Sequence, residues 1–337
     1  MSENYNDPFF SHDQKNVDTV TPSEKTKFII PVVLFIVTFF TTTLAGAEWI
    51  RGFGTRFEFT ELIVGLPYSI SILFILATHE FGHYFASKYH GVKATLPYFI
   101  PFPSLEGFLN FGTMGAVIKT KQAIGNKKAL FDIGVSGPIA GFFASLLILI
   151  YGFSNLPPQE YILSIHPDYF TAEYGKAGLH LEFGTSLLYY ILSQVFTSAN
   201  DFVPPMNEMY HYPYLCVGWF GLFVTAMNLI PVGQLDGGHI TYAMFGEKNQ
   251  VTVASISMII LFILGAGGIV SSLLELPFEF GWSGWLFWAL ILYFFIKVKH
   301  PPVYDDSEID FKRKVTGYFS YLIFILSFSP SPFSITF

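Results

Sequence analysis

Charged side chains are scarce in this sequence. Only 13% of its 337 residues are charged, whereas 52% are hydrophobic and 19% are aromatic. A soluble globular domain carries roughly 25% charged residues, so the composition excludes an ordinary soluble domain and predicts a protein embedded in a lipid bilayer. The formal net charge of -7 at pH 7 excludes the basic footprint of a nucleic-acid-binding protein. We therefore expect no nucleic-acid partner.

Cysteine and internal repetition are also nearly absent. The single cysteine, Cys216, excludes an intramolecular disulfide and gives no information on the redox compartment. It is most simply a small apolar residue within a membrane span. No repeat, low-complexity tract or polar linker marks a second domain, so the length predicts one membrane domain with several spans.

Long apolar runs are what the sequence does contain. A transmembrane helix needs about 20 mainly apolar residues. The sequence contains seven candidate runs, and the last of them is short and is followed closely by two prolines. We therefore predict an all-α polytopic membrane protein with six to seven transmembrane helices. A shorter run, Gly184–Phe196, is expected to lie at the membrane interface. The candidate spans are Phe28–Ala45, Glu61–Ser87, Ala129–Phe153, Tyr214–Pro231, Thr252–Leu274, Trp282–Ile296 and, more weakly, Val315–Phe328.

The chain divides into three expected segments. Residues 1–27 are polar and carry five acidic residues, which argues against a signal peptide or an acid-poor transit peptide and predicts a disordered cytoplasmic tail. Residues 28–300 form one membrane-embedded domain, whose core is expected at 61–245. Residues 301–337 form a C-terminal segment that could include the last, weaker span.

The distribution of basic residues predicts the orientation. With the N-terminus inside, 15 of the 18 basic residues fall on inner segments and only three, Arg51, Arg56 and Lys176, fall on outer ones. Cytoplasmic loops carry such an excess of Lys and Arg. The largest outer loop, Ser154–Pro213, holds six acidic residues and is too short for an added recognition domain, so its role stays open.

An HExxH motif, HEFGH at His79–His83, lies near the inner end of the second span. Residues four apart share a helix face, so His79 and His83 can present ring nitrogens to one metal ion. Glu80 lies about 100° around the helix and can reach a metal-bound water instead of the metal. This is the geometry of a zinc hydrolase.

Two other interpretations of the motif remain open. The motif could arise by chance, or its residues could be satisfied polar groups packed between helices. Ionisable groups cost about 2.5–3.5 kcal/mol each at the centre of a membrane helix. Adjacent ionisable residues in an apolar span therefore favour a functional role.

A third metal ligand is expected from the end of the fourth span. A catalytic zinc site usually takes three protein ligands and leaves a fourth position to water. The fourth span also runs from outside to inside and ends in the helix-breaking run PVGQLDGG, which contains Asp236. The topology brings Asp236 to the depth of the two histidines, and the breaks let its carboxylate turn back toward a metal. Alternatively, Asp236 caps a short helix at Gly237–Phe245.

Three blocks of sequence resemble the site-2 protease family of intramembrane zinc metalloproteases. The blocks are HEFGH at His79–His83, D-x-x-x-S-G-P-x-A-G at Asp132–Gly141, and N-x-x-P-x-x-x-L-D-G-G at Asn228–Gly238. Together they are highly specific, and the match covers the region from about Glu61 to Phe245. Without a recognisable PDZ or CBS domain, the chain is most similar to the EGY-like branch known from plastids and bacteria.

The resemblance implies an active zinc metalloendopeptidase that cleaves peptide bonds in or near transmembrane segments of membrane-protein substrates, as in regulated intramembrane proteolysis. It implies one Zn²⁺ per chain, held by His79, His83 and Asp236. Glu80 would be the general base, and Asn228 would lie beside the active site and contact substrate or stabilise the developing oxyanion. The partners would be transmembrane substrates and the bilayer, and the oligomeric state stays open.

The segment between the second and third spans is apolar but irregular. Leu96–Gln122 is interrupted by prolines and glycines, and its later part, Gly112–Lys119, resembles the family's membrane-associated hairpin. We expect a membrane-associated β-hairpin or re-entrant segment here. An exposed edge could pair with an unwound substrate by strand addition; the alternative is a loop that only seals the site.

Other polar and small residues have simpler expected roles. Gly137 and Gly141 form a GxxxG pattern in the third span, which we interpret as a site of close helix packing. We expect a packing role for the neighbouring Asp132 as well. His239 is expected to support the site, and His90 is expected at the membrane interface.

Two further classes of function fit part of the pattern. Intramembrane His and Asp also mark ion pathways, so a zinc-binding transporter or sensor is one alternative, and a non-cleaving membrane scaffold is another. Glu80 separates the enzyme from the transporter, because transport has no particular need for a proton-shuttling carboxylate between two histidines. The polar, acid-containing N-terminus favours a bacterial cytoplasmic membrane, with the N-terminus and the active site toward the cytoplasm.

Overall fold

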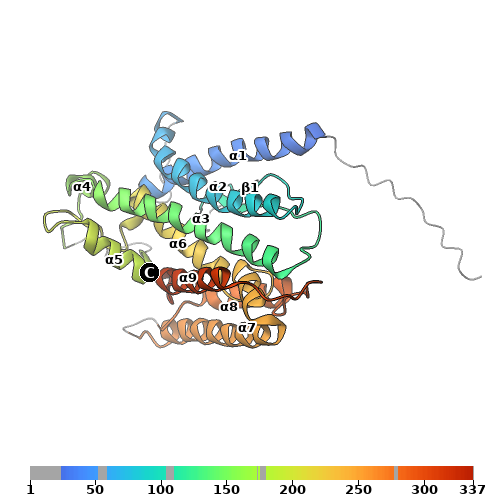
Figure 1. The fold of residues 1–337 in the computed structure, drawn as a ribbon. Helices are drawn as coiled ribbons and strands as arrows, with labels where there is room; N and C mark the ends of the chain where they lie inside the picture. The colour runs from blue at the N-terminus through green and yellow to red at the C-terminus, as the bar shows by residue number, and fades with distance from the viewer. Residues whose placement is uncertain are drawn as a thin grey trace, which may run out of the picture.

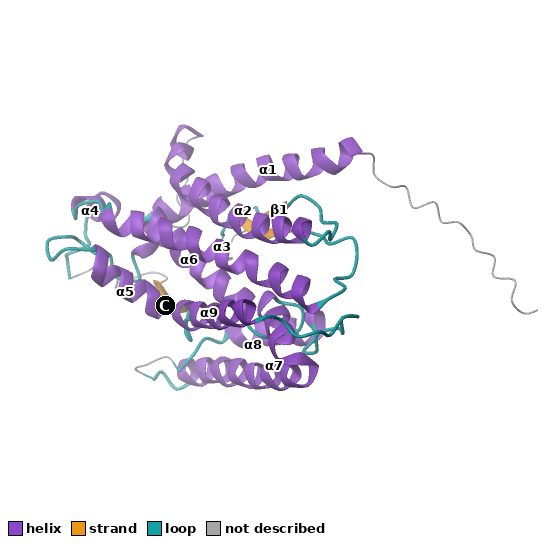
Figure 2. Ribbon diagram, in the orientation of Figure 1, coloured by secondary structure: helices purple, strands orange, loops and turns teal. Residues whose placement is uncertain are grey.

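Helices dominate the computed structural model, which describes residues 24–51, 59–103, 110–172, 174, 180–276 and 280–336 (Figures 1 and 2). The strands form two antiparallel pairs, β1 (Tyr98–Pro101) with β2 (Thr113–Val117) and β3 (His180–Phe183) with β4 (Phe333–Thr336). The helices described are α1 (Glu24–Arg51), η1 (Phe59–Gly65), α2 (Leu66–Tyr89), α3 (Lys127–Ser154), α4 (Glu160–Ile165), α5 (Leu187–Phe196), η2 (Met209–His211), α6 (Pro213–Leu229), α7 (Asp236–Leu273), α8 (Gly284–Ile291), η3 (Leu292–Ile296) and α9 (Phe311–Ser327).

Four of the described helices are long and apolar enough to cross a membrane. They comprise most of α1, α2 with the end of η1, α3 and α7. Helix α6 has 17 residues, and α8 continues into η3 as a 13-residue apolar segment at Gly284–Ile296. The prediction of a helical, polytopic membrane protein is therefore confirmed, whereas the count of six to seven spans stays a prediction. Most of the expected tail at residues 1–27 lies outside the described residues.

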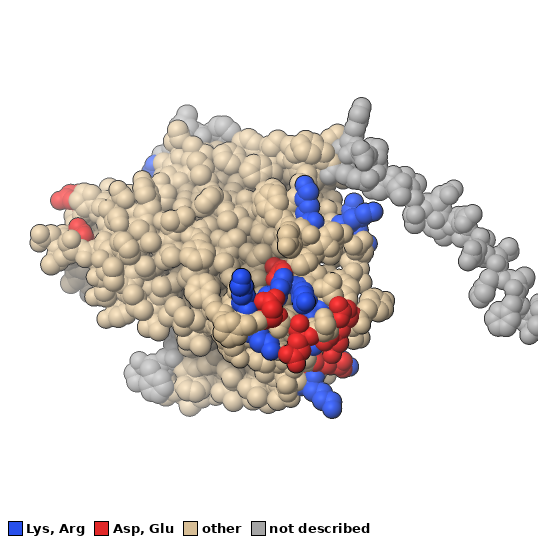
Figure 3. Space-filling view, viewed as in Figure 1, with Lys and Arg blue, Asp and Glu red and all other residues tan. Residues whose placement is uncertain are grey.

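The surface has the character of a lipid-exposed protein. Large apolar side chains project outward from α1 and α7, among them Phe40, Ile259 and Phe262. Figure 3 shows that the charged side chains on the face in view gather mainly toward one end, leaving a broad uncharged area beside them. An uncharged surface of this kind is expected where helices face hydrocarbon, since lipid chains are as apolar as these side chains.

Helices α2, α3 and α6 pack closely because small residues line their contacts. A Cβ atom on Gly82 of α2 would lie 2.6 Å from the carbonyl oxygen of Ser136 in α3. A Cβ atom on Gly221 of α6 would lie 2.1 Å from Oγ of Ser145 in α3. The helix backbones therefore approach directly, which is the usual way that membrane helices associate. Cys216 of α6, predicted as a small apolar residue of a membrane span, is buried in this region.

The β3–β4 pair was not anticipated from the sequence. Its register runs from His180 opposite Thr336 to Phe183 opposite Phe333, so it joins the loop after α3 to the C-terminal residues. The ring of Phe333 packs against Trp219 of α6, with ring centroids 5.3 Å apart. The prediction of an all-α fold therefore holds for the helical bundle but omits this short sheet.

Helix α7 is two helices with one break. Gly246 has φ 78° and ψ 175°, which is a conformation that glycine adopts without the steric penalty of a side chain. The break separates a short first helix, Asp236–Phe245, from the long apolar part. A short helix ending at Phe245 was predicted, and the structure places Asp236 at its first residue rather than at the capping position, which Leu235 occupies.

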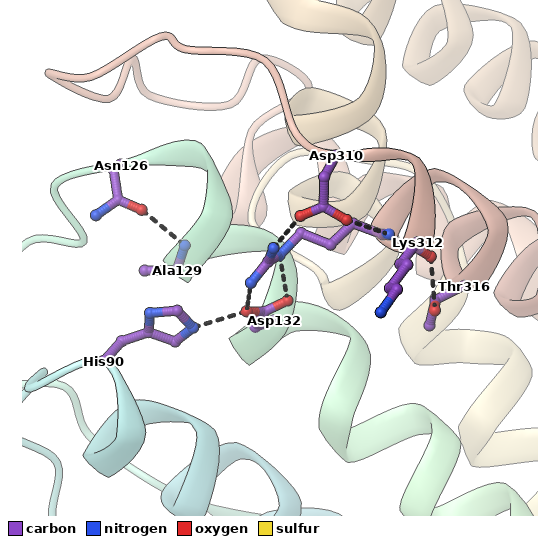
Figure 4. A network of polar contacts seen from close by, with 8 residues as sticks. His90, Asn126, Ala129, Asp132, Asp310, Lys312 and Thr316 are labelled. Carbon is purple, nitrogen blue, oxygen red and sulfur yellow. Dashed lines mark hydrogen bonds and ion pairs between the residues drawn. The ribbon is translucent and has the colours of Figure 1, made fainter.

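A polar network joins three helices at the charged end of the molecule (Figure 4). The carboxylate of Asp132, in the first turns of α3, accepts hydrogen bonds from Nε and Nη2 of Arg313 at 2.8 and 2.5 Å. It also accepts one from Nε2 of His90, which follows α2, at 2.7 Å. Asp310 caps α9 by accepting from the Arg313 backbone N–H at 3.1 Å. His90 and Asp132, predicted as interfacial and packing residues, thus connect the ends of α2, α3 and α9.

Candidate zinc site

Helix α2 positions the first three site residues. It is unbroken from Leu66 to Tyr89, so the spacing of four between His79 and His83 places both rings on one face. Their ring centroids are 4.8 Å apart. All three side chains lie inside the protein: His79 is 6% exposed, Glu80 8% and His83 7%. Three buried ionisable residues in one apolar helix are costly unless they serve a site.

Asp236 completes a triangle of metal-binding atoms with the two histidines. Nε2 of His79 and Nε2 of His83 are 3.1 Å apart, and Oδ2 of Asp236 lies 3.6 and 3.3 Å from them. Ligands about 2.0–2.1 Å from a tetrahedral zinc ion are about 3.3 Å from one another. The three donor atoms therefore stand at the spacing that such an ion requires. Within the described residues, this is one of two clusters with such a spacing.

The tautomer of His83 is fixed by the backbone of α3. Nδ1 of His83 lies 2.7 Å from the carbonyl oxygen of Ile133, and because a carbonyl only accepts, Nδ1 carries the proton. Nε2 then keeps its lone pair toward the triangle. Metal-binding histidines commonly have their other ring nitrogen held in this way, which orients the ring.

The predicted residue Asn228 also lies beside the site. Asn228 lies in the last turn of α6, and its Nδ2 is 3.4 Å from Nε2 of His79. All five predicted site residues, His79, Glu80, His83, Asn228 and Asp236, line a single cavity of about 650 Å³. Cavities of about 300–1,000 Å³ are typical of ligand sites. The structure thus brings together the five residues that were predicted as metal ligands or catalytic residues.

Two glycines of α3 pack directly against the histidines. A Cβ atom on Gly137 would lie 2.1 Å from Nε2 of His83, and one on Gly141 would lie 3.0 Å from Nδ1 of His79. The predicted close packing of the GxxxG pattern is present, and its partners are the candidate metal ligands themselves. The sequence alone could indicate tight packing but not against which side chains.

Strand β2 forms one wall of the cavity. Ala116, Val117 and Ile118 line it, and the backbone N–H of Ile118 donates a hydrogen bond to the Glu80 carboxylate. An antiparallel pair, β1–β2, lies between the second and third spans, and the edge of β2 away from β1, which is unpaired among the described residues, faces the site. Its position relative to a membrane stays a prediction.

The C-terminal segment contributes to the cavity as well. His300 and the residues that follow it line the opening, and Nε2 of His300 is 2.7 Å from Nδ1 of His239. His239 was expected to support the site, whereas nothing in the sequence around His300 has a spacing that pointed to it. Burial lowers the pKa of His300, which favours a neutral ring at this position.

Comparison with known proteins identifies the family. A model of peptidase family M50 matches residues 67–266, which is more than half of the chain and includes the whole donor triangle. The chain belongs to peptidase family M50. This is the site-2 protease family of zinc metalloproteases that the three sequence blocks resemble, and the M50 match extends beyond the expected core at 61–245 into the long part of α7.

Two curated relatives of this M50 chain come from plants. The probable zinc metalloprotease EGY2, chloroplastic, of Oryza sativa subsp. indica is 26% identical over 306 residues, covering 88% of the chain and 49% of the relative. The probable zinc metalloprotease EGY1, chloroplastic, of Arabidopsis thaliana is 28% identical over 266 residues, covering 79% of the chain and 43% of the relative. The chain thus spans about half the length of the curated relatives it matches.

The donor set of the M50 site fits Zn²⁺. Two imidazole nitrogens and one carboxylate oxygen are ligands that zinc takes in catalytic sites, where a fourth position stays open. The relatives are named as zinc metalloproteases. The chain accordingly carries a site-2 type zinc metalloprotease domain with Zn²⁺ as its cofactor.

Proposed function

We propose that this chain is an intramembrane zinc endopeptidase that cleaves peptide bonds in or near transmembrane segments of membrane-protein substrates. The observation that carries the proposal is the convergence of His79, His83 and Asp236 on one point, with Glu80 on the wall of the same cavity. These residues come from helices whose outer surfaces are apolar. A hydrolytic site inside a membrane domain is accessible to substrates that are themselves embedded in the membrane.

In this proposal the chain's own residues handle the proton transfers. Glu80 takes a proton from the attacking water and passes it to the leaving amine, which is general acid–base catalysis. The Ile118 N–H that donates to Glu80 orients the carboxylate toward the cavity. His79, His83 and Asp236 hold the zinc ion, which when bound supplies Lewis-acid polarisation of the scissile carbonyl and a more acidic water. Asn228, whose Nδ2 is 3.4 Å from Nε2 of His79, donates in this proposal to the oxygen that gains charge.

The free edge of β2 suggests how a substrate is held. A peptide bond within an intact helix is shielded, so the substrate must unwind before cleavage. An unwound segment exposes backbone donors and acceptors that an unpaired strand edge can satisfy. We propose that the edge formed by Ala116, Val117 and Ile118 pairs with the unwound substrate and carries its scissile bond past Glu80.

The membrane and the orientation are further parts of the proposal. The excess of Lys and Arg on alternate segments supports an N-terminus and an active site toward the cytoplasm, with six to seven spans. The membrane in this proposal is a bacterial cytoplasmic membrane. The relatives named above are described as chloroplastic, and a plastid membrane is the alternative.

Replacement of Glu80 by Gln tests the mechanism. Glu80→Gln removes the proton acceptor but keeps the size and the hydrogen-bonding oxygen, so cleavage of a single-span reporter should fall by about 10²–10⁴-fold. The zinc content should equal that of the wild type, because Glu80 is not one of the three donors. The measurement is reporter cleavage in membranes together with zinc analysis of the purified protein.

The result also separates the competing functions. A variant that still cuts at the wild-type rate would overturn the proposed role of Glu80. A wild-type protein that binds zinc but cuts no transmembrane reporter would favour the transporter or scaffold alternative. Membrane proteomics that compares the wild type with Glu80→Gln would then identify substrates as single-span proteins that accumulate in the variant.

A further inference from the structure

A second cluster of metal-binding side chains lies far from the zinc site. It consists of His166, which follows α4, of Glu208, which directly precedes the short helix η2, and of His211, which ends it. Helix α3 contacts His83 near its start through Ile133 and leads about 30 Å along its axis to the segment that holds α4. Figure 1 shows α4 and α5 at the end of the bundle where α3 finishes. The two clusters therefore lie at opposite ends of the membrane domain.

The cluster has nearly the same dimensions as the zinc site. Nε2 of His166 and Nε2 of His211 are 3.0 Å apart, and Oε2 of Glu208 lies 3.6 and 3.5 Å from them. The corresponding three distances at the first site are 3.1, 3.6 and 3.3 Å. Both triangles match the spacing of about 3.3 Å between ligands of a tetrahedral zinc ion.

Local structure explains how Glu208 and His211 come to face one point. They are three residues apart, and side chains at i and i+3 eclipse in a 3₁₀ helix. The backbone supports this geometry, because the N–H of His211 donates to the carbonyl of Glu208 at 3.1 Å. The turn from Glu208 to His211 thus provides a carboxylate and an imidazole on one face, and His166, just after α4, supplies the third donor.

Surrounding groups fix the orientation of the donors. Nδ1 of His211 donates to the carbonyl oxygen of Ile50, at the end of α1, at 2.8 Å, so Nε2 carries a lone pair toward the cluster. The other oxygen of Glu208, Oε1, accepts hydrogen bonds from Tyr174 and from Nδ2 of Asn207, which turns Oε2 toward the imidazoles. Such outer contacts are typical of metal ligands.

The burial of two of the three donors suits a bound cation. The side chains of Glu208 and His211 are 2% and 0% exposed, whereas His166 is 29% exposed and offers an entry path. A bound cation would reduce the cost of burying this carboxylate.

We propose that His166, Glu208 and His211 form a second binding site for a divalent transition-metal ion of the zinc class. Two imidazoles and a carboxylate favour zinc over the hard cations calcium and magnesium, which prefer oxygen ligands. The ion would tie the segment after α3 to η2 and, through Ile50, to the end of α1, so its role is structural. The expected zinc content of the chain rises from one to two.

Zinc counting on the full-length protein tests the proposal. The protein, purified in detergent and equilibrated with Zn²⁺, should hold two equivalents. Two variants should each hold one: His166→Ala, and the double change His79→Ala with His83→Ala. The combination of all three changes should hold none. Asp168→Asn, an exposed neighbour of His166, is the matched control and should keep two.

A second readout separates metal binding from simple hydrogen bonding within the cluster. Added Zn²⁺ should raise the thermal unfolding midpoint of the His79→Ala, His83→Ala protein, and it should not do so once His166 is also replaced. One equivalent in the wild type with none in the His79→Ala, His83→Ala protein would overturn the second site while leaving the first intact. Two equivalents in His166→Ala would also overturn it. None of these outcomes depends on proteolysis.

Discussion

The position of one metal-binding nitrogen in the zinc site depends on Gly137, a residue without a side chain. Gly137 allows α3 to approach α2 so closely that the space for its absent Cβ is taken by Nε2 of His83, 2.1 Å away. His83 has little freedom to retreat, since its Nδ1 is held by Ile133. Nε2 of His83 can therefore occupy its position only because residue 137 has no Cβ atom.

Gly137→Ala should consequently displace His83 and weaken zinc binding. Changes that disturb the orientation of a metal ligand commonly cost 10–100-fold in affinity, and we expect a loss of about this size, with cleavage reduced at least as much. Competition with a fluorescent zinc chelator measures the affinity. Gly125→Ala is the matched control, because a Cβ atom there meets nothing within 4 Å; equal affinities in the two variants would contradict the argument.

At this scale the sequence could predict residues but not their surroundings. His79, Glu80 and His83 follow from one local spacing, and Asp236 follows from the direction of two spans. The roles of Ile118, His300 and Gly137 depend on contacts between segments far apart in the chain, which no local pattern encodes. For the same reason the second cluster was missed, as His166 and His211 are 45 positions apart.

Among the secondary-structure elements, the hairpin β1–β2 does most to shape the cavity. In a strand, backbone N–H groups alternate between the two edges. The N–H of Ile118 points to Glu80, so that of Ala116, two residues earlier, lies on the same free edge. Strand β1 occupies the other edge, where Tyr98 and Phe99 lie opposite Val117 and Ala116.

Ala116→Pro should therefore impair cleavage without loss of metal. Proline removes one donor from the free edge, and a net hydrogen bond of about 0.5–1.5 kcal/mol corresponds to a drop of up to about tenfold in kcat/KM. Ala116→Ser keeps the N–H and serves as the control. Cleavage assays with zinc analysis decide the matter: unchanged kcat/KM in the proline variant would leave the hairpin only a sealing role.

The elements themselves were largely predictable. The apolar runs gave α1, α2, α3 and α6 because their length and hydropathy leave few alternatives to a helix. The pairing of β3 with β4 was not predictable, since it joins residues about 150 positions apart and both strands are only four residues long. The break at Gly246 was indicated only by the expected end of the short helix at Phe245.

At the scale of the whole molecule, the two clusters lie at opposite ends, so the orientation of the protein in the membrane decides which cluster faces the cytoplasm. This orientation can be measured. If the N-terminus is inside, Lys128 lies on the cytoplasmic side and Ala199 on the other side of the membrane. Both residues are exposed. The native Cys216 is 0% exposed, so single cysteines introduced at these positions report without removal of the native one.

A membrane-impermeant maleimide added to intact bacterial cells should accordingly label Ala199→Cys. It should label Lys128→Cys only after permeabilisation, and the unmodified chain should remain unlabelled. The reverse pattern would place the catalytic site on the outer side and the second cluster toward the cytoplasm. Labelling is measured by the mass shift of the purified protein.

The order of the zinc donors along the chain has a consequence for biosynthesis. His79 and His83 are made early, but Asp236 follows only after α3 and α6 have been completed. A partly synthesised chain therefore holds two of the three donors, and the cavity still lacks the wall that His300 and its neighbours provide. On the proposed function, a chain released before residue 236 lacks the third donor and would not cut its neighbours.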